Sequence, residues 1–149
     1  VAVPRQVTEA RAQPSLAVAS MLRGAPASAV ESWIVYHLKV GFHRVYLFFD
    51  DPEDPALPAA ETIAASTARP RSVKVHACSD AWWCQARRRS RFYQNRGEPW
   101  AQSVISAHEK FRDVQSRQCL CIDLAMQDAF RDGIRWFVHI DVDELLYFP

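Results

Sequence analysis

The chain has 149 residues, a formal net charge of +1 at pH 7 and a hydrophobic content of 49%, which is enough for one globular domain with a sizeable core. The balanced charge argues against a nucleic-acid-binding protein and against electrostatic attachment to an acidic membrane. No apolar run approaches the roughly 18 residues that cross a bilayer, and no signal-peptide pattern is visible. We therefore expect neither a nucleic-acid partner nor a membrane segment in this chain.

The first part of the chain predicts a lead-in followed by one domain. Residues 1–14 are polar and contain two prolines, so we expect them to be irregular. The apolar run 16–22 predicts a buried strand at the start of a domain that covers residues 15–149. Gly24 and Pro26 follow this run and should end the strand.

A helix and a second strand come next. Ser28 and Glu31 have the spacing of a capping box, in which two side chains satisfy backbone N–H groups of the first turn. Apolar residues then recur at helical spacing, and Gly41 is placed to end the helix. The run 44–49 is almost uniformly apolar, which is typical of a strand in a sheet covered on both faces.

The remaining sequence continues this alternation. Residues 58–67 predict a helix opened by proline, and 73–77 predict a short third strand. Residues 80–115 are rich in Arg, Trp and Gln and favour a mixture of loop and short helix. The last predicted elements are a helix over 116–131 and a strand over 135–140. The core face predicted for that helix consists of Cys119, Ile122, Ala125, Met126, Ala129 and Phe130.

Strands that alternate with helices predict an α/β domain with a mainly parallel, Rossmann-like sheet and flanking helices. In such sheets, ligands bind at the carboxyl ends of the strands. Asp50 and Asp51 follow the second predicted strand, and Asp141 and Asp143 follow the last one. We therefore expect a ligand site at that edge of the sheet.

The spacing of Asp141 and Asp143 predicts a site for a hard cation. Along an extended backbone their carboxylates would point to one side. Mg²⁺ or Mn²⁺ binds through one or two carboxylates while phosphate oxygens complete its shell. Glu144 adds a third acid, and crowded carboxylates repel one another unless a cation compensates them. The alternative is a turn in which Asp caps the backbone.

Asp50 and Asp51 also have two interpretations. Acids at strand ends of nucleotide-binding α/β folds accept hydrogen bonds from a ribose or a base edge. A plain Asx-turn before Pro52 explains the pair equally well. The first interpretation gains weight from the second acidic cluster at the same predicted edge.

Other chemically active side chains have simpler interpretations. His37 and His139 lie beside core residues of regular elements, so we interpret them as hydrogen-bonded structural histidines. The arginine-rich run 87–91 and its aromatic neighbours resemble a nucleic-acid-binding stripe, but the balanced charge favours a solvated surface or an acceptor-side loop. The four cysteines lack zinc-type spacing and are expected to be buried thiols, with a single Cys78–Cys84 bridge as the alternative.

Two blocks of the sequence resemble family 92-like glycosyltransferases, relatives of family 2 that have the GT-A fold. The first block is residues 31–42, ESWIVYHLKVGF, with the following strand that ends in Asp50 and Asp51. The second block, residues 117–145, leads through a strand into the Asp-Val-Asp motif. Both blocks occur in the order found in the family, and together they span most of residues 16–146.

The resemblance implies a metal-dependent enzyme that transfers a sugar from a UDP- or GDP-sugar donor to a hydroxyl of a glycan or another acceptor. Asp141 and Asp143 would hold the Mn²⁺ or Mg²⁺ that bridges the diphosphate and acts as a Lewis acid. Arg117 and Gln118 match a helix start that faces the donor, although a surface position is an equal alternative. The donor-binding residues that the resemblance implies are Arg23, Asp50, Asp51, Gln118 and Asp141.

The chain also departs from the family pattern. Relatives carry a Lys/Arg-Asn-Glu triplet after the first strand, whereas residues 23–25 are Arg-Gly-Ala, so only Arg23 remains. The turn 52–54 replaces a loop richer in Ser and Gly. The family's catalytic base lies downstream of the Asp-Val-Asp motif, hence beyond Pro149, and we assign none. We therefore expect a donor-binding half of a GT-A domain that is truncated after the motif and inactive alone. The family resemblance also implies an enzyme of the Golgi or another part of the secretory pathway, or one that is associated with a membrane.

Two other functions fit parts of the pattern. A phosphatase of the haloacid-dehalogenase type also has Asp-x-Asp after a strand. However, Leu145 stands where that family has Thr or Val, and its motif opens the catalytic domain. A nucleotide- or metal-binding fragment without turnover is the third possibility.

Overall fold

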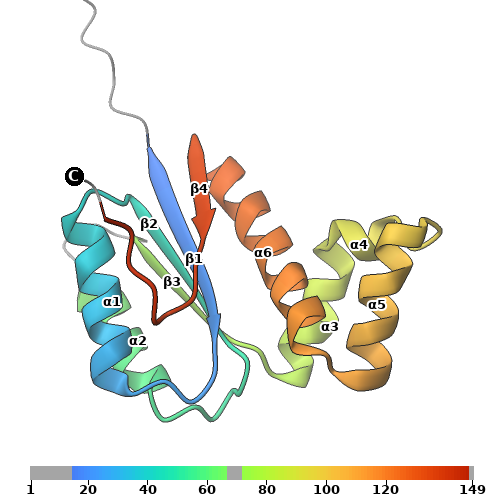
Figure 1. Ribbon diagram of the computed structural model, residues 1–149, viewed down its shortest axis with the longest axis horizontal. Coiled ribbons are helices and arrows are strands. Elements are labelled where there is room, and N and C mark those ends of the chain that lie inside the picture. The colour runs from blue at the N-terminus through green and yellow to red at the C-terminus, as the bar shows by residue number, and fades with distance from the viewer. Residues whose placement is uncertain (1–14, 67–71, 148–149) are drawn as a thin grey trace, which may run out of the picture.

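In a computed structural model, which describes residues 15–66 and 72–147, the chain forms a four-stranded parallel sheet with helices on both faces (Figure 1). The strand order is β3-β2-β1-β4. The predicted α/β class with a parallel sheet and flanking helices is confirmed. The elements are β1 (Leu16–Leu22), α1 (Ala27–Lys39), β2 (Arg44–Phe49), α2 (Leu57–Ser66), β3 (Val73–Ala77), α3 (Asp80–Arg89), α4 (Arg91–Gln94), α5 (Pro99–Phe111), α6 (Val114–Arg131) and β4 (Trp136–His139).

The predicted strands and three predicted helices lie where expected, with ends that differ by one or two residues. The predicted lead-in 1–14 lies outside the described residues, as does the expected end of α2 at residue 67. Gly41 adopts a φ of +112° just beyond α1, a conformation that favours glycine at the end of a helix. None of the helices in the described ranges is long and apolar enough to span a membrane.

The predicted capping box of α1 is wrong. Pro26 is the N-cap, and no side chain caps the first turn. The Pro26 carbonyl accepts the N–H groups of Ala29 at 2.9 Å and Val30 at 3.1 Å. The helix therefore begins before Ser28, and neither Ser28 nor Glu31 is in a position to cap it.

Residues 80–115 contain the three helices α3, α4 and α5 and the start of α6, so the segment is more helical than the expected mixture of loop and short helix. Ser79 caps α3 by accepting the N–H of Trp82 at 3.2 Å, and Ser90 caps α4 by accepting the N–H of Phe92 at 3.2 Å. These serines are ordinary N-cap signals. The Arg- and Trp-rich composition of 82–92 obscured them, because that stretch lacks a clear apolar stripe.

Side chains alternate along each strand, so the sheet has a separate apolar core on each face. Figure 1 shows α1 and α2 on one side of the sheet and α3 to α6 on the other. The core on the α1 side contains Val18, Leu22, Val30, Trp33, Ile34, Val45, Leu47 and Phe49. The core on the α6 side contains Ala17, Ala19, Tyr46, Phe48, Trp83, Leu120, Cys121 and Leu124.

The predicted core face of α6 is confirmed for Ala125 and Ala129, which are buried, and is wrong for three of its six residues. Cys119 is exposed, and Met126 and Phe130 are 43% and 83% exposed. The prediction followed the bulkiest apolar residues, whereas the buried side of the helix mixes small and apolar residues with paired charges. Its buried members are Ser116, Arg117, Leu120, Cys121, Asp123, Leu124, Ala125, Asp128 and Ala129.

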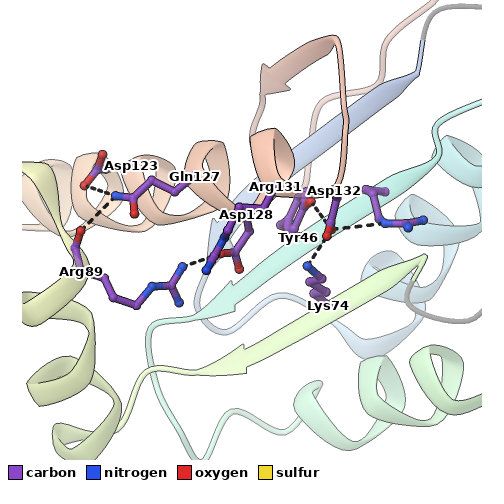
Figure 2. A network of polar contacts seen from close by, with 9 residues as sticks. Tyr46, Lys74, Arg89, Asp123, Gln127, Asp128, Arg131 and Asp132 are labelled. Atoms are coloured by element: carbon purple, nitrogen blue, oxygen red, sulfur yellow. Dashed lines mark hydrogen bonds and ion pairs between the residues drawn. The ribbon is translucent and has the colours of Figure 1, made fainter.

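A polar network anchors the end of α6 to the sheet (Figure 2). Asp132 accepts hydrogen bonds from Tyr46 Oη at 3.0 Å, Lys74 Nζ at 2.7 Å and Arg44 Nε at 3.4 Å. Burial by itself would raise the pKa of Asp132, but the hydrogen bonds from Lys74 and Tyr46 and the nearby positive charges lower it. The network therefore joins α6 to β2 and β3 through an ionised carboxylate.

A second group of contacts joins α6 to α3 (Figure 2). Asp128 pairs with Arg89 and Arg131. Gln127 Nε2 donates to the Arg89 carbonyl at 3.2 Å and to Asp123 Oδ2 at 3.3 Å. These partners explain how the buried side of α6 can include acids, since a buried carboxylate is costly unless it is paired.

Candidate functional site

A cleft of about 430 Å³ opens at the carboxyl ends of β1, β2 and β3. Arg23 follows β1, while Asp50 and Asp51 follow β2. The sheet thus brings together three of the residues that the sequence predicted for donor binding, at the edge where ligands bind in parallel sheets. The lining residues are Arg23, Asp50, Asp51, Pro52, Cys78, Ser79, Asp80, Arg112 and Arg117.

Asp50 is buried in a two-pronged ion pair with Arg117. Their side chains are 4% and 8% exposed. Arg117 Nη2 lies 2.8 Å from Asp50 Oδ1, and Arg117 Nη1 donates to Oδ2 at 3.1 Å. The guanidinium also lies 5.1 Å from the centre of the Trp83 ring. Oδ2 of Asp50 accepts a hydrogen bond from Arg117, whereas the buried Oδ1 has only the ion-pair contact. Because the whole carboxylate is buried against Arg117, its expected contact with a nucleoside would be indirect.

The charged side chains on the outer wall of the cleft are more exposed than Asp50 and Arg117. Arg23 is 67% exposed and approaches Asp50 Oδ2 at 3.8 Å and Asp51 Oδ2 at 3.7 Å. Across the cleft, Arg112 Nη2 donates to the exposed Asp80 carboxylate at 3.2 Å. Exposed ion pairs of this kind contribute little stability, so these arginines can exchange their partners for an anionic ligand.

Gln118 connects α6 to the end of β4. Its Nε2 donates to Asp141 Oδ1 at 3.1 Å and lies 3.1 Å from His139 Nε2. Burial lowers the pKa of His139, although Asp141 and Glu144 act in the opposite direction. A neutral imidazole can accept this hydrogen bond, which agrees with the structural role predicted for His139. Gln118 and Asp141, predicted separately, are direct partners.

The second predicted structural histidine also has a backbone partner. His37 Nδ1 lies 2.8 Å from the Trp33 carbonyl, and the side chain is fully buried. Burial lowers the pKa of His37, although the hydrogen bond to Trp33 acts in the opposite direction. This buried imidazole, bonded to the backbone of α1, therefore has a structural role in the core and does not face a ligand site.

The Asp-Val-Asp-Glu motif forms a turn. β4 ends at His139, so the extended backbone predicted for Asp141 and Asp143 is wrong. The Asp141 N–H donates to Glu144 Oε2 at 3.1 Å, and the Glu144 N–H donates to the Asp141 carbonyl at 3.0 Å. Glu144 thus supports the turn, while Asp141 and Asp143 are exposed.

Helix α1 holds the segment that follows this turn. Trp33 Nε1 donates to the Glu144 carbonyl at 2.9 Å, and Tyr36 Oη donates to the Leu146 carbonyl at 2.6 Å. Val142 and Leu146 pack against the core on the α1 side. In Figure 1 this segment, in dark red, runs between α1 and the sheet. The two sequence blocks that carry the family resemblance are therefore in direct contact.

The strand order sets the spacing of the predicted site residues. β1 lies between β2 and β4, so Asp50 and Asp141 are two strands apart, or roughly 10 Å at the usual strand spacing. Within the described ranges, no three His, Cys, Asp or Glu side chains form a group that could hold a metal ion. Asp141 and Asp143 supply two exposed carboxylates on one turn, fewer than such a group needs.

Several lining residues were missed by sequence reasoning. Cys78, Ser79, Asp80 and Arg112 reach the cleft because α3 starts there and α5 ends there. Arg112 has a φ of +51° where α5 ends, an uncommon conformation for a residue with a side chain. Its position depends on helices that the composition of 80–115 did not reveal.

His108, on α5 behind the cleft, leads to a prediction about acid stability. It is 5% exposed, and its ring lies 4.6 Å from that of Trp83. Burial, followed by the positive charges of Arg87 and Arg117, lowers the pKa of His108 to about 4. The folded pKa is below the unfolded value of about 6.5, so this group favours folding above pH 6.5. Its contribution is lost as the pH falls from 6.5 towards 4.

Between pH 6.5 and 4.5, we expect the free energy of unfolding of His108→Phe to fall by roughly 1–2 kcal/mol less than that of the wild type. This range allows for screening by solvent in the adjoining cavity. Urea denaturation of both proteins at a series of pH values measures this difference. Parallel pH profiles for the wild type and His108→Phe would contradict the prediction. If such parallel profiles were offset by a constant amount, that offset would measure only the change in packing.

Comparison of the chain with models of known protein families, with curated proteins and with solved structures finds no match in any of the three.

Proposed function

We propose that this chain carries the donor-binding part of a metal-dependent glycosyltransferase of the GT-A type. The reaction moves a sugar from a UDP- or GDP-sugar to a hydroxyl of a glycan or other acceptor. The observation that carries the proposal is the Asp-Val-Asp turn after β4, whose two exposed carboxylates share a sheet edge with a polar cleft. The resemblance of residues 31–42 and 117–145 to family 92-like glycosyltransferases also supports a location in the Golgi or elsewhere in the secretory pathway.

In this proposal, Asp141 and Asp143 hold Mn²⁺ or Mg²⁺. When bound, the cation supplies a Lewis acid for the leaving nucleoside diphosphate. Gln118 donates to one oxygen of Asp141, which orients this carboxylate and leaves its other oxygen available. Trp33 fixes the backbone of the turn through the Glu144 carbonyl. The protein therefore presents an exposed acidic turn on a backbone that is already held in place.

The cleft serves the nucleotide in this proposal. Asp51 is half-buried and can accept hydrogen bonds from hydroxyl or amide groups. Arg23 is exposed and has only long contacts to its acidic neighbours, so its guanidinium can turn towards a phosphate. Asp50 has an indirect role: its ion pair with Arg117 positions the guanidinium at the floor of the cleft. No catalytic base is assigned.

Nucleotide binding tests the proposal. We expect UDP or GDP to bind in the presence of Mn²⁺ and to bind at least tenfold more weakly, a loss of about 1.4 kcal/mol, to Asp143→Ala. The reason is that the cation loses a carboxylate ligand while the fold loses no contact, since Asp143 is exposed. Isothermal titration calorimetry of each nucleotide with and without Mn²⁺ measures both effects.

A matched control is Glu61→Ala, which removes an exposed acid from α2. This variant should bind as the wild type does. Nucleotide binding that is independent of Mn²⁺, or unchanged in Asp143→Ala, would contradict the proposal. Binding of aluminium fluoride or phosphate in the absence of nucleotide would instead favour the phosphatase alternative.

A further inference from the structure

Two of the four cysteines meet beside the cleft. Cys78 follows β3 and Cys121 lies in α6, and they are 3% and 0% exposed. Both belong to the same buried core cluster, and Cys78 is close enough to Cys121 to contribute to the raised pKa of its thiol. Cys84 and Cys119, in contrast, are exposed. The bridge considered from the sequence, Cys78–Cys84, is therefore not the pair that the fold brings together.

The residues that carry the two thiols are each tied to the end of β2. The Cys78 N–H donates to the Phe49 carbonyl at 2.9 Å, which ties this residue to the end of β2. Cys121 lies one helical turn after Arg117, whose ion pair with Asp50 ties α6 to that same end of β2. Both residues are thus held near the end of one strand, inside the same buried cluster.

We propose that Cys78 and Cys121 form an intramolecular disulfide when the protein folds in an oxidising environment. The oxidant is a low-molecular-weight disulfide such as glutathione disulfide. One cysteine thiolate attacks it, forms a mixed disulfide and releases one glutathione thiolate. The second cysteine thiolate attacks the mixed disulfide, forms the protein bond and releases the other glutathione. The protein loses two protons and two electrons, and two glutathione thiols are produced.

Burial determines when this bond forms. Burial first, and then the contact with Cys78, raise the pKa of Cys121 well above its usual value. Because the thiolate is the reactive form, the pair reacts slowly once the protein is folded. The disulfide is therefore made during folding, while both thiols are accessible, and is shielded from reductants afterwards.

The bond would have a structural consequence that does not depend on the proposed function. It closes a loop of about 40 residues that contains α3, α4 and α5, and closing a loop of this length restricts the unfolded chain substantially. Because Cys78 lines the cleft, the bond would also fix one wall of it. This region includes Ser79, Asp80 and Arg112, the lining residues that the sequence did not reveal.

The test is to refold the denatured, reduced chain in a buffer of oxidised and reduced glutathione. We expect peptide mapping by mass spectrometry without reduction to show a Cys78–Cys121 cross-link. We also expect the Tm to be roughly 5–10 °C higher than that of the protein refolded with dithiothreitol. The double variant Cys84→Ser/Cys119→Ser, which removes the two exposed thiols, should show the same cross-link and the same shift.

Cys121→Ser should lose both the cross-link and the redox-dependent shift in Tm. Recovery of Cys78 and Cys121 as free thiols after refolding in the glutathione buffer would overturn the proposal. A bridge that involves Cys84 or Cys119 would overturn it as well. The peptide map of the wild-type chain decides between these outcomes. The proposal can therefore be tested even if the Cys121→Ser variant does not fold.

Discussion

Replacing Arg117 with alanine is expected to destabilise the fold by about 3–5 kcal/mol, the usual cost of removing one partner from a buried ion pair. The change leaves the Asp50 carboxylate, which is 4% exposed, without the guanidinium 2.8 Å away. Arg23 cannot replace that partner, because it is 67% exposed and 3.8 Å from Asp50. Urea denaturation followed by circular dichroism measures the difference in the free energy of unfolding.

Two further variants separate the charge from the geometry. Arg117→Lys keeps a positive charge but loses the two-pronged contact, so we expect it to recover only part of the loss. The double variant Asp50→Leu/Arg117→Met replaces both charges with apolar side chains and should recover most of it. A double variant as unstable as Arg117→Ala would show that packing against Trp83, rather than the ion pair, holds this region.

The same ion pair shows what the sequence could predict and what it could not. The acids after β2 were recognisable because a uniformly apolar strand preceded them. Arg117 lies 67 residues away, and nothing in the local pattern of a helix reveals whether an arginine near its start is buried. Asp50 was consequently expected to meet the nucleoside, whereas the structure places Arg117 against it.

Helix α6 shows a second limit. Its length and position followed from periodicity, but Met126 and Phe130, the two largest residues assigned to its core face, are exposed. The buried face was hard to recognise because it includes Asp123 and Asp128, whose partners include Arg91 of α4 and Arg89 of α3. Hydrophobicity alone ranks such residues as exposed, although pairing makes their burial possible.

The region after α2 shows a third limit. Strand β3 was predictable, whereas the three helices of 80–115 were not. The Arg- and Trp-rich stretch 82–92 has no clear apolar stripe, and it drew attention away from α5, which buries Ala101, Ile105 and His108 at helical spacing. Four of the nine residues that line the cleft, Cys78, Ser79, Asp80 and Arg112, come from this region and the residues just before it. The sequence therefore identified the strand-end residues of the site better than the helix-end residues that complete it.

Trp33 joins the core to the acidic turn, and its removal is expected to cost about 3–5 kcal/mol in Trp33→Ala. The side chain is 2% exposed, and it fills the space between α1 and the sheet. It also donates from Nε1 to the Glu144 carbonyl at 2.9 Å. The variant therefore loses core packing and the anchor of the turn together, and chemical denaturation reports their sum.

Trp33→Phe isolates the anchor, because it keeps an aromatic ring and removes the N–H group. We expect this variant to lose only about 1–2 kcal/mol of stability. We also expect faster amide hydrogen exchange in residues 141–146, with exchange in β1 and β2 unchanged. Equal exchange in 141–146 for the wild type and Trp33→Phe would show that Tyr36 and the packing of Val142 suffice to hold the segment. Selective loosening would show that α1, the first block of the resemblance, positions the carboxylates of the second.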